Sequence, residues 1–480
     1  MQRILSIFNV KTTPTFGVFA WVIILSGWLS AAFESFYPLA IPAMAILIYF
    51  SIVDFRNIFF FLLACIPLST EFYFPNGYGT DLPTEPLTIG LMLIYWLYAL
   101  KNGVILRGGA FFRHPITLLI LLHLGWILIT TVNSENVFLS LKFLLAKTWY
   151  IVTFYFLAGL ILQKQKDFKT FFWCIAIPLS IALVVTLFRQ YGQGFSFKDV
   201  NKVMDPFFRN HVTYGCITVL FLPYIFLARS WQKRGSWVKG LLAGLIILFL
   251  LAIQFSYVRA AYVGIFGALG YYLVVRFQLT RYVLGFVTVA GIVLITYMVQ
   301  GNNYLNFTPN FEKTITHERF DNLLDATAKG EDVSTMERVY RWVAGFRMIE
   351  DKPFMGFGPN NFYSFYKSYT LTGFKTYVSD NPEKSTIHCY YLLMAVEQGI
   401  PGALIFLGLV GFALLRGERV YHQVHDWRRS VIMAVMASFV IILFLLLIND
   451  LVETDKFGSF FFMSLAALTN LDISTREGVE

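Results

Sequence analysis

The chain has 480 residues, of which 57% are hydrophobic, 18% aromatic and only 14% charged. A soluble domain carries about 25% charged residues, so this composition excludes a single water-soluble core and predicts that much apolar surface faces lipid. The formal net charge is +9, but no nucleic-acid-binding motif accompanies it, and we expect no nucleic-acid partner.

Apolar runs long enough to cross a bilayer follow one another along the whole chain. A membrane-spanning helix needs about 20 predominantly apolar residues. The sequence therefore predicts an all-α polytopic membrane protein of about 14 transmembrane helices, within a range of about 12–14. The predicted spans are 16–33, 37–53, 57–74, 86–101, 115–132, 143–162, 168–188, 211–228, 238–257, 260–275, 282–299, 402–415, 431–449 and 457–471.

Lysine and arginine are distributed between the connections in a way that orients the chain. When the N-terminus is placed in the cytoplasm, every short inner connection carries basic residues, for example Arg56, Lys164 and Arg276. The outer connections 34–37 and 70–85 carry none. Because basic residues concentrate on the cytoplasmic side of membrane proteins, the pattern predicts an N-in/C-in topology.

One connection is much longer than the others and divides the chain into three parts. Residues 1–299 hold the transmembrane helices before it, 300–401 form the large outer loop, and 402–480 hold the last transmembrane helices and a cytoplasmic tail. Long connections of this kind are usually functional. We therefore expect the loop to contain catalytic helices.

Three outer arginines are candidates for binding an anion. Arg259 lies at the tip of a predicted helical hairpin over 238–275. An arginine at membrane depth is either functional or an anchor whose head group reaches the interface. Arg338 and Arg341 lie three residues apart on a predicted amphipathic helix over 334–350 and share one face. That face either binds a substrate or is only solvated.

A second helix of the loop is predicted over about 387–398, capped by Thr386 or the serine before it and ended at Gly399. His388 would lie in its first turn. The helix dipole there disfavours the imidazolium, so the ring would be neutral and able to accept a proton. Glu397 lies nine residues further on, faces away from His388, and is expected to tie its helix to neighbouring elements.

Four segments resemble, in order, the signature of the O-antigen ligase and polymerase family, which also includes protein O-oligosaccharyltransferases. The segments are Ser256-Tyr257-Val258-Arg259, Glu337-Arg338-Val339-Tyr340-Arg341-Trp342, Lys352-Pro353-Phe354-Met355-Gly356-Phe357-Gly358-Pro359, and His388-Cys389-Tyr390-Tyr391-Leu392 through Glu397-Gln398-Gly399-Ile400-Pro401-Gly402. The resemblance covers roughly 250–402. Val258 stands where the family has serine, and Cys389 stands where it usually has asparagine.

The resemblance implies which residues act. The essential outer arginine of the family corresponds to Arg259 and its catalytic histidine to His388. Arg338 matches the loop arginine, Arg341 is its neighbour, and Arg209 loosely matches a basic residue at the start of a span. His388 would be the general base, and the arginines would bind diphosphate. No cofactor and no metal are expected, because neither an aspartate-rich metal motif nor a phosphate-binding glycine loop is evident.

The resemblance also implies a glycosyltransferase of the bacterial inner membrane whose active site faces the periplasm. Such an enzyme moves a glycan from undecaprenyl diphosphate to an acceptor hydroxyl, with inversion at the sugar carbon. We favour O-antigen ligase-like transfer to a lipid A core. An O-antigen or exopolysaccharide polymerase, with a glycan acceptor, and a protein O-oligosaccharyltransferase stay open. A polysaccharide transporter or flippase is the alternative of another class, although transporters usually show internal repeats.

Overall fold

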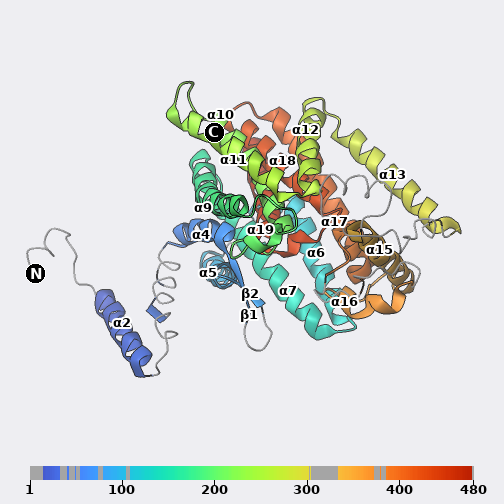
Figure 1. Cartoon of the computed structure of the whole chain (residues 1–480), viewed down its shortest axis with the longest axis horizontal. Coiled ribbons are helices and arrows are strands. Elements are labelled where there is room, and N and C mark those ends of the chain that lie inside the picture. Colours follow the sequence, from blue (N-terminus) through green and yellow to red (C-terminus); the bar gives the residue numbers. More distant parts are fainter. Residues whose placement is uncertain are drawn as a thin grey trace, which may run out of the picture.

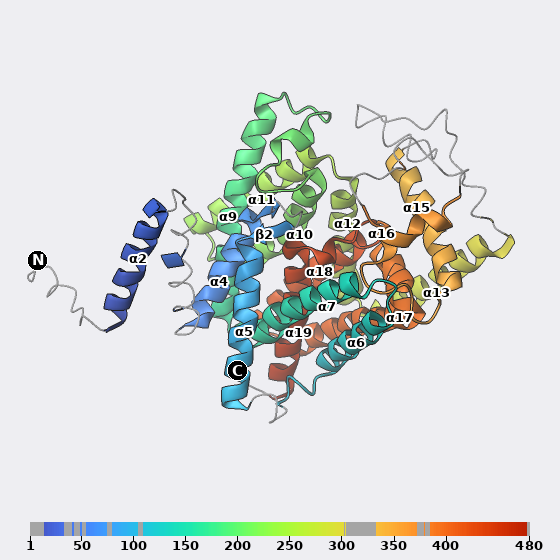
Figure 2. The same cartoon turned by 90° about the horizontal axis from the view of Figure 1, so that it is seen from below.

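The computed structural model describes residues 14–32, 41–42, 49, 54–73, 79–103, 109–301, 303, 333–371, 379 and 385–477. These residues are mostly helical, and most of the helices form one bundle (Figure 1). Both views show α2, near the N-terminus, apart from that bundle (Figures 1 and 2). The predicted span 37–53 lies outside the described residues except at 41–42 and 49, and so does most of 302–332.

The described elements alternate between long apolar helices and short connections. In chain order they are α2 (Pro14–Ala32), α4 (Phe55–Cys65), the 3-10 turn η2 (Ile66–Leu68), β1 (Thr70–Tyr73), β2 (Gly79–Leu82), α5 (Thr84–Asn102), α6 (Pro115–Val132), α7 (Val137–Ile151), the π-helical turn η3 (Val152–Leu157), α8 (Ala158–Ile161), α9 (Gln165–Gly192), η4 (Val200–Val203), α10 (His211–Ser230), α11 (Trp237–Ser256), α12 (Arg259–Arg276), α13 (Thr280–Val299), α15 (Val333–Asp351), α16 (Phe362–Phe365), η6 (Tyr366–Tyr369), α17 (Tyr390–Gln423), α18 (Trp427–Leu445), η8 (Leu451–Glu453) and α19 (Asp455–Arg476).

Nine helical segments among the described residues are long and apolar enough to cross a membrane. They are Pro115–Val132, Val137–Ile161, Gln165–Gly192, His211–Ser230, Trp237–Ser256, Thr280–Met298, Tyr390–Gln423, Trp427–Leu445 and Asp455–Arg476. Each contains a stretch close to the ~20 residues that a bilayer requires. The prediction of an all-α, multi-pass membrane protein is therefore confirmed.

The predicted span 57–74 is wrong in its last third. The helical part ends at Leu68, and the chain continues as β1, which pairs antiparallel with β2 so that Thr70 lies opposite Leu82. Thr70 and Phe72 belong to residue types that favour strands. This two-stranded sheet caps one end of the bundle instead of extending a transmembrane helix.

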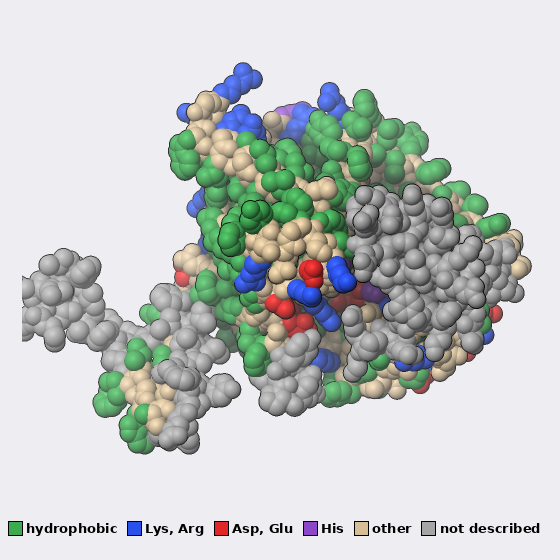
Figure 3. All heavy atoms as spheres, in the orientation of Figure 1, with side chains coloured by type: hydrophobic (Ala, Val, Ile, Leu, Met, Phe, Trp, Pro, Cys, Tyr) green, Lys and Arg blue, Asp and Glu red, His purple; other side chains and the backbone are tan. Residues whose placement is uncertain are grey.

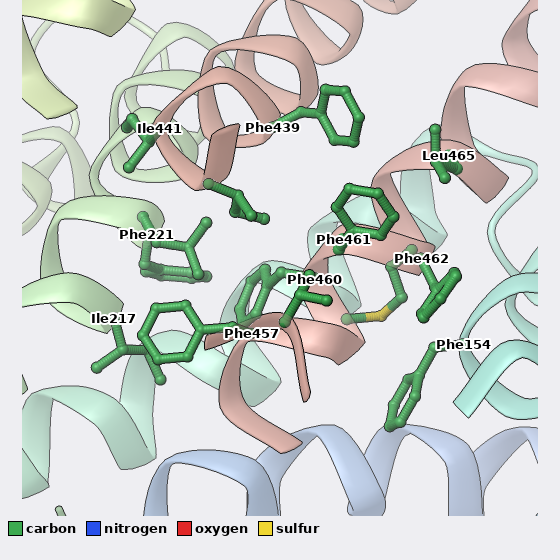
Figure 4. Close-up of a cluster of buried hydrophobic side chains, with 14 of the residues drawn as sticks. Phe154, Ile217, Phe221, Phe439, Ile441, Phe457, Phe460, Phe461, Phe462 and Leu465 are labelled. Carbon is green, nitrogen blue, oxygen red and sulfur yellow. The ribbon is translucent and has the colours of Figure 1, made fainter. Parts of the chain in front are cut away.

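Helix α19 carries much of the buried core. Its side chains Phe457, Phe460 and Phe461 are at most 1% exposed. Figure 4 shows these rings among side chains of neighbouring helices; the Phe460 ring lies 6.2 Å from that of Phe221 in α10, and the Phe461 ring lies 5.2 Å from that of Phe439 in α18. Close packing of this kind, and not hydrophobic expulsion from water, holds helices together inside a bilayer. Helix α19 thus fixes the relative positions of α10 and α18.

The helices α10 and α12 run antiparallel to α18, so their first residues lie at the end where α18 finishes. Ser438 of α18 donates to the Leu220 carbonyl of α10 at 2.9 Å. Tyr390, the first residue of α17, donates its backbone N–H to the Leu446 carbonyl just after α18, also at 2.9 Å. We call this end of the bundle, where α10, α12 and α17 begin, the site end.

The opposite end of the bundle, where these helices finish, is called the basic end. Here the His422 ring lies 2.7 Å from the Val275 carbonyl, which brings the last turns of α17 and α12 together. Asp472 near the end of α19 accepts from the Arg416 guanidinium at 2.5 and 2.6 Å. The two ends therefore differ in chemistry as well as in chain direction.

Candidate functional site

The segment just before α17 is held by side chains of α15. The Arg341 guanidinium donates to the Thr386 carbonyl at 2.9 Å, and the Trp342 indole donates to the Ile387 carbonyl at 3.1 Å. Arg341 is 5% exposed and also lies 3.5 Å from the Glu337 carboxylate. The motif residues of the predicted helix 334–350, observed as Val333–Asp351, therefore fix the backbone that leads into His388.

The prediction that His388 lies in the first turn of a helix is wrong. His388 has φ 55°, in the left-handed region, and α17 begins only at Tyr390. Cys389 occupies the N-cap position, and its side chain forms no capping hydrogen bond. The expected cap, Thr386, instead donates its hydroxyl to the Asp450 carboxylate at 2.7 Å. Because Tyr390 N–H is satisfied by Leu446 rather than by a local cap, a tertiary contact sets the helix start.

The surroundings of His388 keep its ring neutral. Burial lowers the pKa of His388 to about 3, and the positive charges of Arg338 and Arg341 contribute to the same shift. The ring is partly buried, and its Nδ1 atom has no hydrogen-bond partner among the described residues. The structure thus brings two predicted site residues, Arg338 and Arg341, near the imidazole of a third, His388.

Two motif segments form a single unit at the glycine-rich turn. The backbone N–H groups of Phe357 and Gly358 donate to the carbonyls of Val396 and Glu397 at 3.0 and 2.9 Å. A Cβ atom at Gly356, which has φ 65°, would lie 2.5 Å from the Glu397 carbonyl carbon. The glycine-rich turn can therefore approach the helix only without a side chain at that position.

Glu397 binds this turn, as expected of a residue that ties its helix to neighbouring elements. Its carboxylate accepts from the backbone N–H groups of Asn360 and Phe362 at 2.8 and 3.0 Å. Glu397 is 3% exposed, so these bonds satisfy a buried acid. Gly399, two residues after Glu397, has φ 71° and places a kink inside α17, which joins the predicted helices over 387–398 and 402–415.

Arg209 lies near two acidic residues of the site end, Glu71 and Asp450. Its guanidinium is 3.7 Å from the Glu71 carboxylate of β1. Burial raises the pKa of Asp450 above its ordinary value, and the positive charge of Arg209 opposes that shift. Asp450, Thr386 and Arg209 therefore share one polar region at the site end.

Sequence analysis did not identify three polar side chains of this region, those of Asp450, Lys147 and Glu453. Asp450 binds Thr386, and Lys147 donates to the Glu453 carboxylate at 2.6 Å. The Tyr390 hydroxyl donates to the same carboxylate at 2.6 Å. The only available indication was the acidic connection between the last two predicted spans, which contains both Asp450 and Glu453.

Arg259 is the first residue of α12, at the tip of the predicted hairpin. Tyr257, with φ 56°, makes the sharp turn between α11 and α12, and the Ser256 hydroxyl accepts from the Val258 N–H at 3.3 Å. Gly215 of α10 packs against this turn, since a Cβ there would lie 2.6 Å from the Ser256 hydroxyl oxygen. The antiparallel packing of α12 on α18 places Arg259 at the site end, with Arg209.

The site end combines basic side chains with helix N-termini. The helices α10, α12 and α17 all begin at this end, where their dipoles contribute partial positive charge. Basic and acidic side chains and a histidine gather on the face shown in Figure 3, bordered by hydrophobic ones. Such an arrangement favours an anionic ligand such as a phosphate.

The motif segments described above fall within one known family domain. Residues 244–407 match the family model described as O-antigen ligase. The chain therefore contains a region that matches the O-antigen ligase family. This confirms the resemblance predicted from the sequence and supports a glycosyltransferase at the general level. Arg259, Arg338, Arg341 and His388 lie inside the O-antigen ligase domain, whereas Arg209 lies before it. No curated protein gives a significant match to the chain.

The kink at Gly399 should be important for stability. Replacement Gly399→Ala should lower the free energy of unfolding by about 1–3 kcal/mol, since a side chain is strained at positive φ and a Cβ would lie 2.9 Å from the Pro353 carbonyl oxygen. Gly408→Ala in the same helix is the matched control, because nothing lies within 4 Å of its Cβ position. Thermal unfolding of both variants in one detergent checks this; equal melting temperatures would contradict it.

The neutral state of His388 should persist well below neutral pH. Because the folded-state pKa of His388 is about 3, its ring should stay unprotonated from pH 8 to pH 5, whereas an ordinary histidine titrates near pH 6.5. Imidazole NMR shifts of histidine-labelled protein, assigned with His388→Gln, measure this. Arg338→Gln removes a nearby positive charge and should raise the pKa. A His388 midpoint near pH 6.5 in the unaltered protein would contradict the structure.

Proposed function

We propose that this chain moves a glycan from undecaprenyl diphosphate to an acceptor hydroxyl, as an O-antigen ligase that uses a lipid A core. The observation that carries the proposal is the meeting of a neutral histidine, arginines and helix N-termini within a domain of the O-antigen ligase family. The donor diphosphate suits the cationic site end, and the polyprenyl chain suits the surrounding bilayer.

In this proposal His388 is the general base. The acceptor hydroxyl gives its proton to the imidazole while its oxygen bonds to the anomeric carbon. The bond from that carbon to the diphosphate oxygen breaks, and undecaprenyl diphosphate leaves with the electron pair. Attack opposite the leaving group inverts the sugar carbon.

A pKa of about 3 makes the free His388 a weak base. Binding of the anionic diphosphate beside Arg338 and Arg341 would raise that pKa and so activate the base only when donor is present.

The arginines have different tasks in this proposal. Arg259, Arg338 and Arg209 bind the diphosphate and stabilise the charge that develops on it, for which a planar guanidinium is suited. Arg341 already donates to the Thr386 carbonyl, so it positions the His388 segment and adds its charge to the site. No metal or cofactor takes part in the proposed transfer.

The proposed topology places the site end in the periplasm. We propose about 14 spans of an inner-membrane protein in an N-in/C-in arrangement, with parts 1–299, 300–401 and 402–480 as defined above. The basic end, which holds Arg276, Arg416 and Arg429, would then face the cytoplasm. The connection 70–85 at the site end holds no lysine or arginine, in keeping with the positive-inside rule.

Cysteine labelling should show opposite exposure of the two ends. A cysteine at Asn303 should react with a membrane-impermeant maleimide in cells whose outer membrane alone has been permeabilised. A cysteine at Arg234, in the connection between α10 and α11, should react only after the inner membrane is lysed. The reverse pattern would contradict the topology and the periplasmic site with it.

Replacement of the two central residues should separate catalysis from binding. His388→Ala should reduce turnover by ~10²–10⁴ and leave donor binding nearly intact, since it removes only the base. Arg259→Ala should weaken both donor binding and turnover, and Arg259→Lys should rescue poorly because an ammonium lacks the planar two-pronged contact. Transfer by purified protein and binding of a labelled lipid-linked donor are the measurements.

The exposed residues His425 and Arg281, at the basic end, provide matched controls, and alanine at either should leave both measurements unchanged. In a deletion strain, unaltered protein should restore long glycan on lipid A. A single-repeat cap in the deletion strain would instead indicate a polymerase, and a missing protein glycan would indicate an O-oligosaccharyltransferase. Normal transfer by His388→Ala at normal protein level would overturn the assignment of the base.

A further inference from the structure

Helices α10, α12 and α18 leave a groove between them in the half of the bundle nearer the basic end. Its volume is about 860 Å³, within the range of sites that hold small molecules. Closer to the site end, α12 packs tightly on α18, since a Cβ at Gly264 would lie 3.2 Å from the Ile441 side chain. Small side chains such as Ala268 and Ala437 line the wider part. The groove therefore forms where small side chains leave space between helices that are in close contact nearer the site end.

One end of the groove is cationic, whereas its length is apolar. Arg276 and Arg429 line the groove, and neither forms an ion pair with a described residue. The Arg429 guanidinium lies 4.6 Å from the centre of the Tyr421 ring, and its buried Nε has no hydrogen-bond partner among the described residues. A buried donor without a partner costs about 1–3 kcal/mol unless a ligand satisfies it.

The acidic residue of the groove does not supply that partner. Asp426 also lines the groove, but its carboxylate accepts from the backbone N–H and the Nε atom of Arg428 at 2.8–3.1 Å. The Arg276 guanidinium has a neutral neighbour, the Tyr272 hydroxyl, at 3.4 Å. The two arginines therefore present positive charge to whatever enters this end of the groove.

We propose that the groove binds an anionic diacyl phospholipid of the membrane. Its head-group phosphate would lie at Arg276 and Arg429, and one acyl chain would follow the apolar walls of α10, α12 and α18. A basic pocket between membrane helices is the kind of site that holds anionic lipid head groups. A free phosphate would leave the apolar walls empty, and an uncharged lipid would leave the Arg429 donor unsatisfied.

This lipid site is separate from the proposed transfer site and does not depend on it. Both use α12 and α18, but the transfer residues lie at the site end and the groove lies in the half nearer the basic end. A lipid in the groove fills the space between α10, α12 and α18, so it should stabilise the folded protein by mass action. The structure thus assigns Arg276 and Arg429 a ligand of their own.

Native mass spectrometry of the purified full chain tests the proposal. Delipidated protein is titrated with dioleoyl phosphatidylglycerol and, in parallel, with dioleoyl phosphatidylcholine, which has the same chains and a zwitterionic head. One phosphatidylglycerol should bind at least about tenfold more tightly than phosphatidylcholine and should raise the melting temperature. The double replacement Arg276→Gln and Arg429→Gln should weaken phosphatidylglycerol binding about tenfold or more, as expected for lost charge-assisted bonds.

Two further variants separate charge from groove shape. Arg234→Gln removes one exposed positive charge outside the groove and should leave binding unchanged. Ala437→Trp should fill the groove and reduce binding of phosphatidylglycerol while both arginines remain; gel filtration checks that each variant is folded. Equal affinity for the two head groups, unchanged binding in the double variant, or tighter binding of undecaprenyl phosphate than of phosphatidylglycerol would overturn the proposal.

Discussion

The arrangement of the site depends on how the backbone before His388 is held. Arg341 and Trp342, neighbours on α15, donate to the consecutive carbonyls of Thr386 and Ile387. These two bonds join a helix of the long connection to the start of a membrane helix that lies about 45 positions further along the chain. Tyr390 is bonded to Leu446 on the other side, so the backbone of His388 and Cys389 between these contacts is held at both ends. The left-handed conformation of His388 is therefore maintained by tertiary contacts on both sides.

The same contacts explain how a neutral histidine can lie among positive charges. Burial, and after it the positive charges of Arg338 and Arg341, lower the pKa of His388, so the ring is neutral and the cationic field is left for an anionic ligand. The acidic groups nearby are occupied in other ways: Asp450 with Thr386, and Glu453 with Lys147 and Tyr390. These bonds satisfy polar groups that packing would otherwise leave buried and unpaired. Binding of a diphosphate and activation of a base would then be linked by electrostatics.

Local sequence patterns were sufficient to predict some structural elements but not others. The hairpin over 238–275 and the helix over 334–350 were predicted because helical periodicity and turn residues act locally. Glu397 was expected to bind neighbouring elements, and its bonds to Asn360 and Phe362 confirm that. The predicted start of the helix at about 387 was wrong. The observed start, at Tyr390, is set by the Leu446 carbonyl, which lies more than 50 residues away in the chain. Asp450 was missed for the same reason, since its contact with Thr386 exists only in the folded chain.

The central claim is that His388 and Arg259 act on one donor molecule. A structure of the protein with a lipid-linked glycan or its diphosphate product, solved in a lipid nanodisc, measures this most directly. The account predicts that the diphosphate contacts the Arg259 guanidinium and that the imidazole of His388 and this guanidinium lie within roughly 15 Å of each other, the reach of one bound substrate with hydrogen-bond contacts at both groups. A greater separation, or a diphosphate bound away from Arg259, would contradict a shared site.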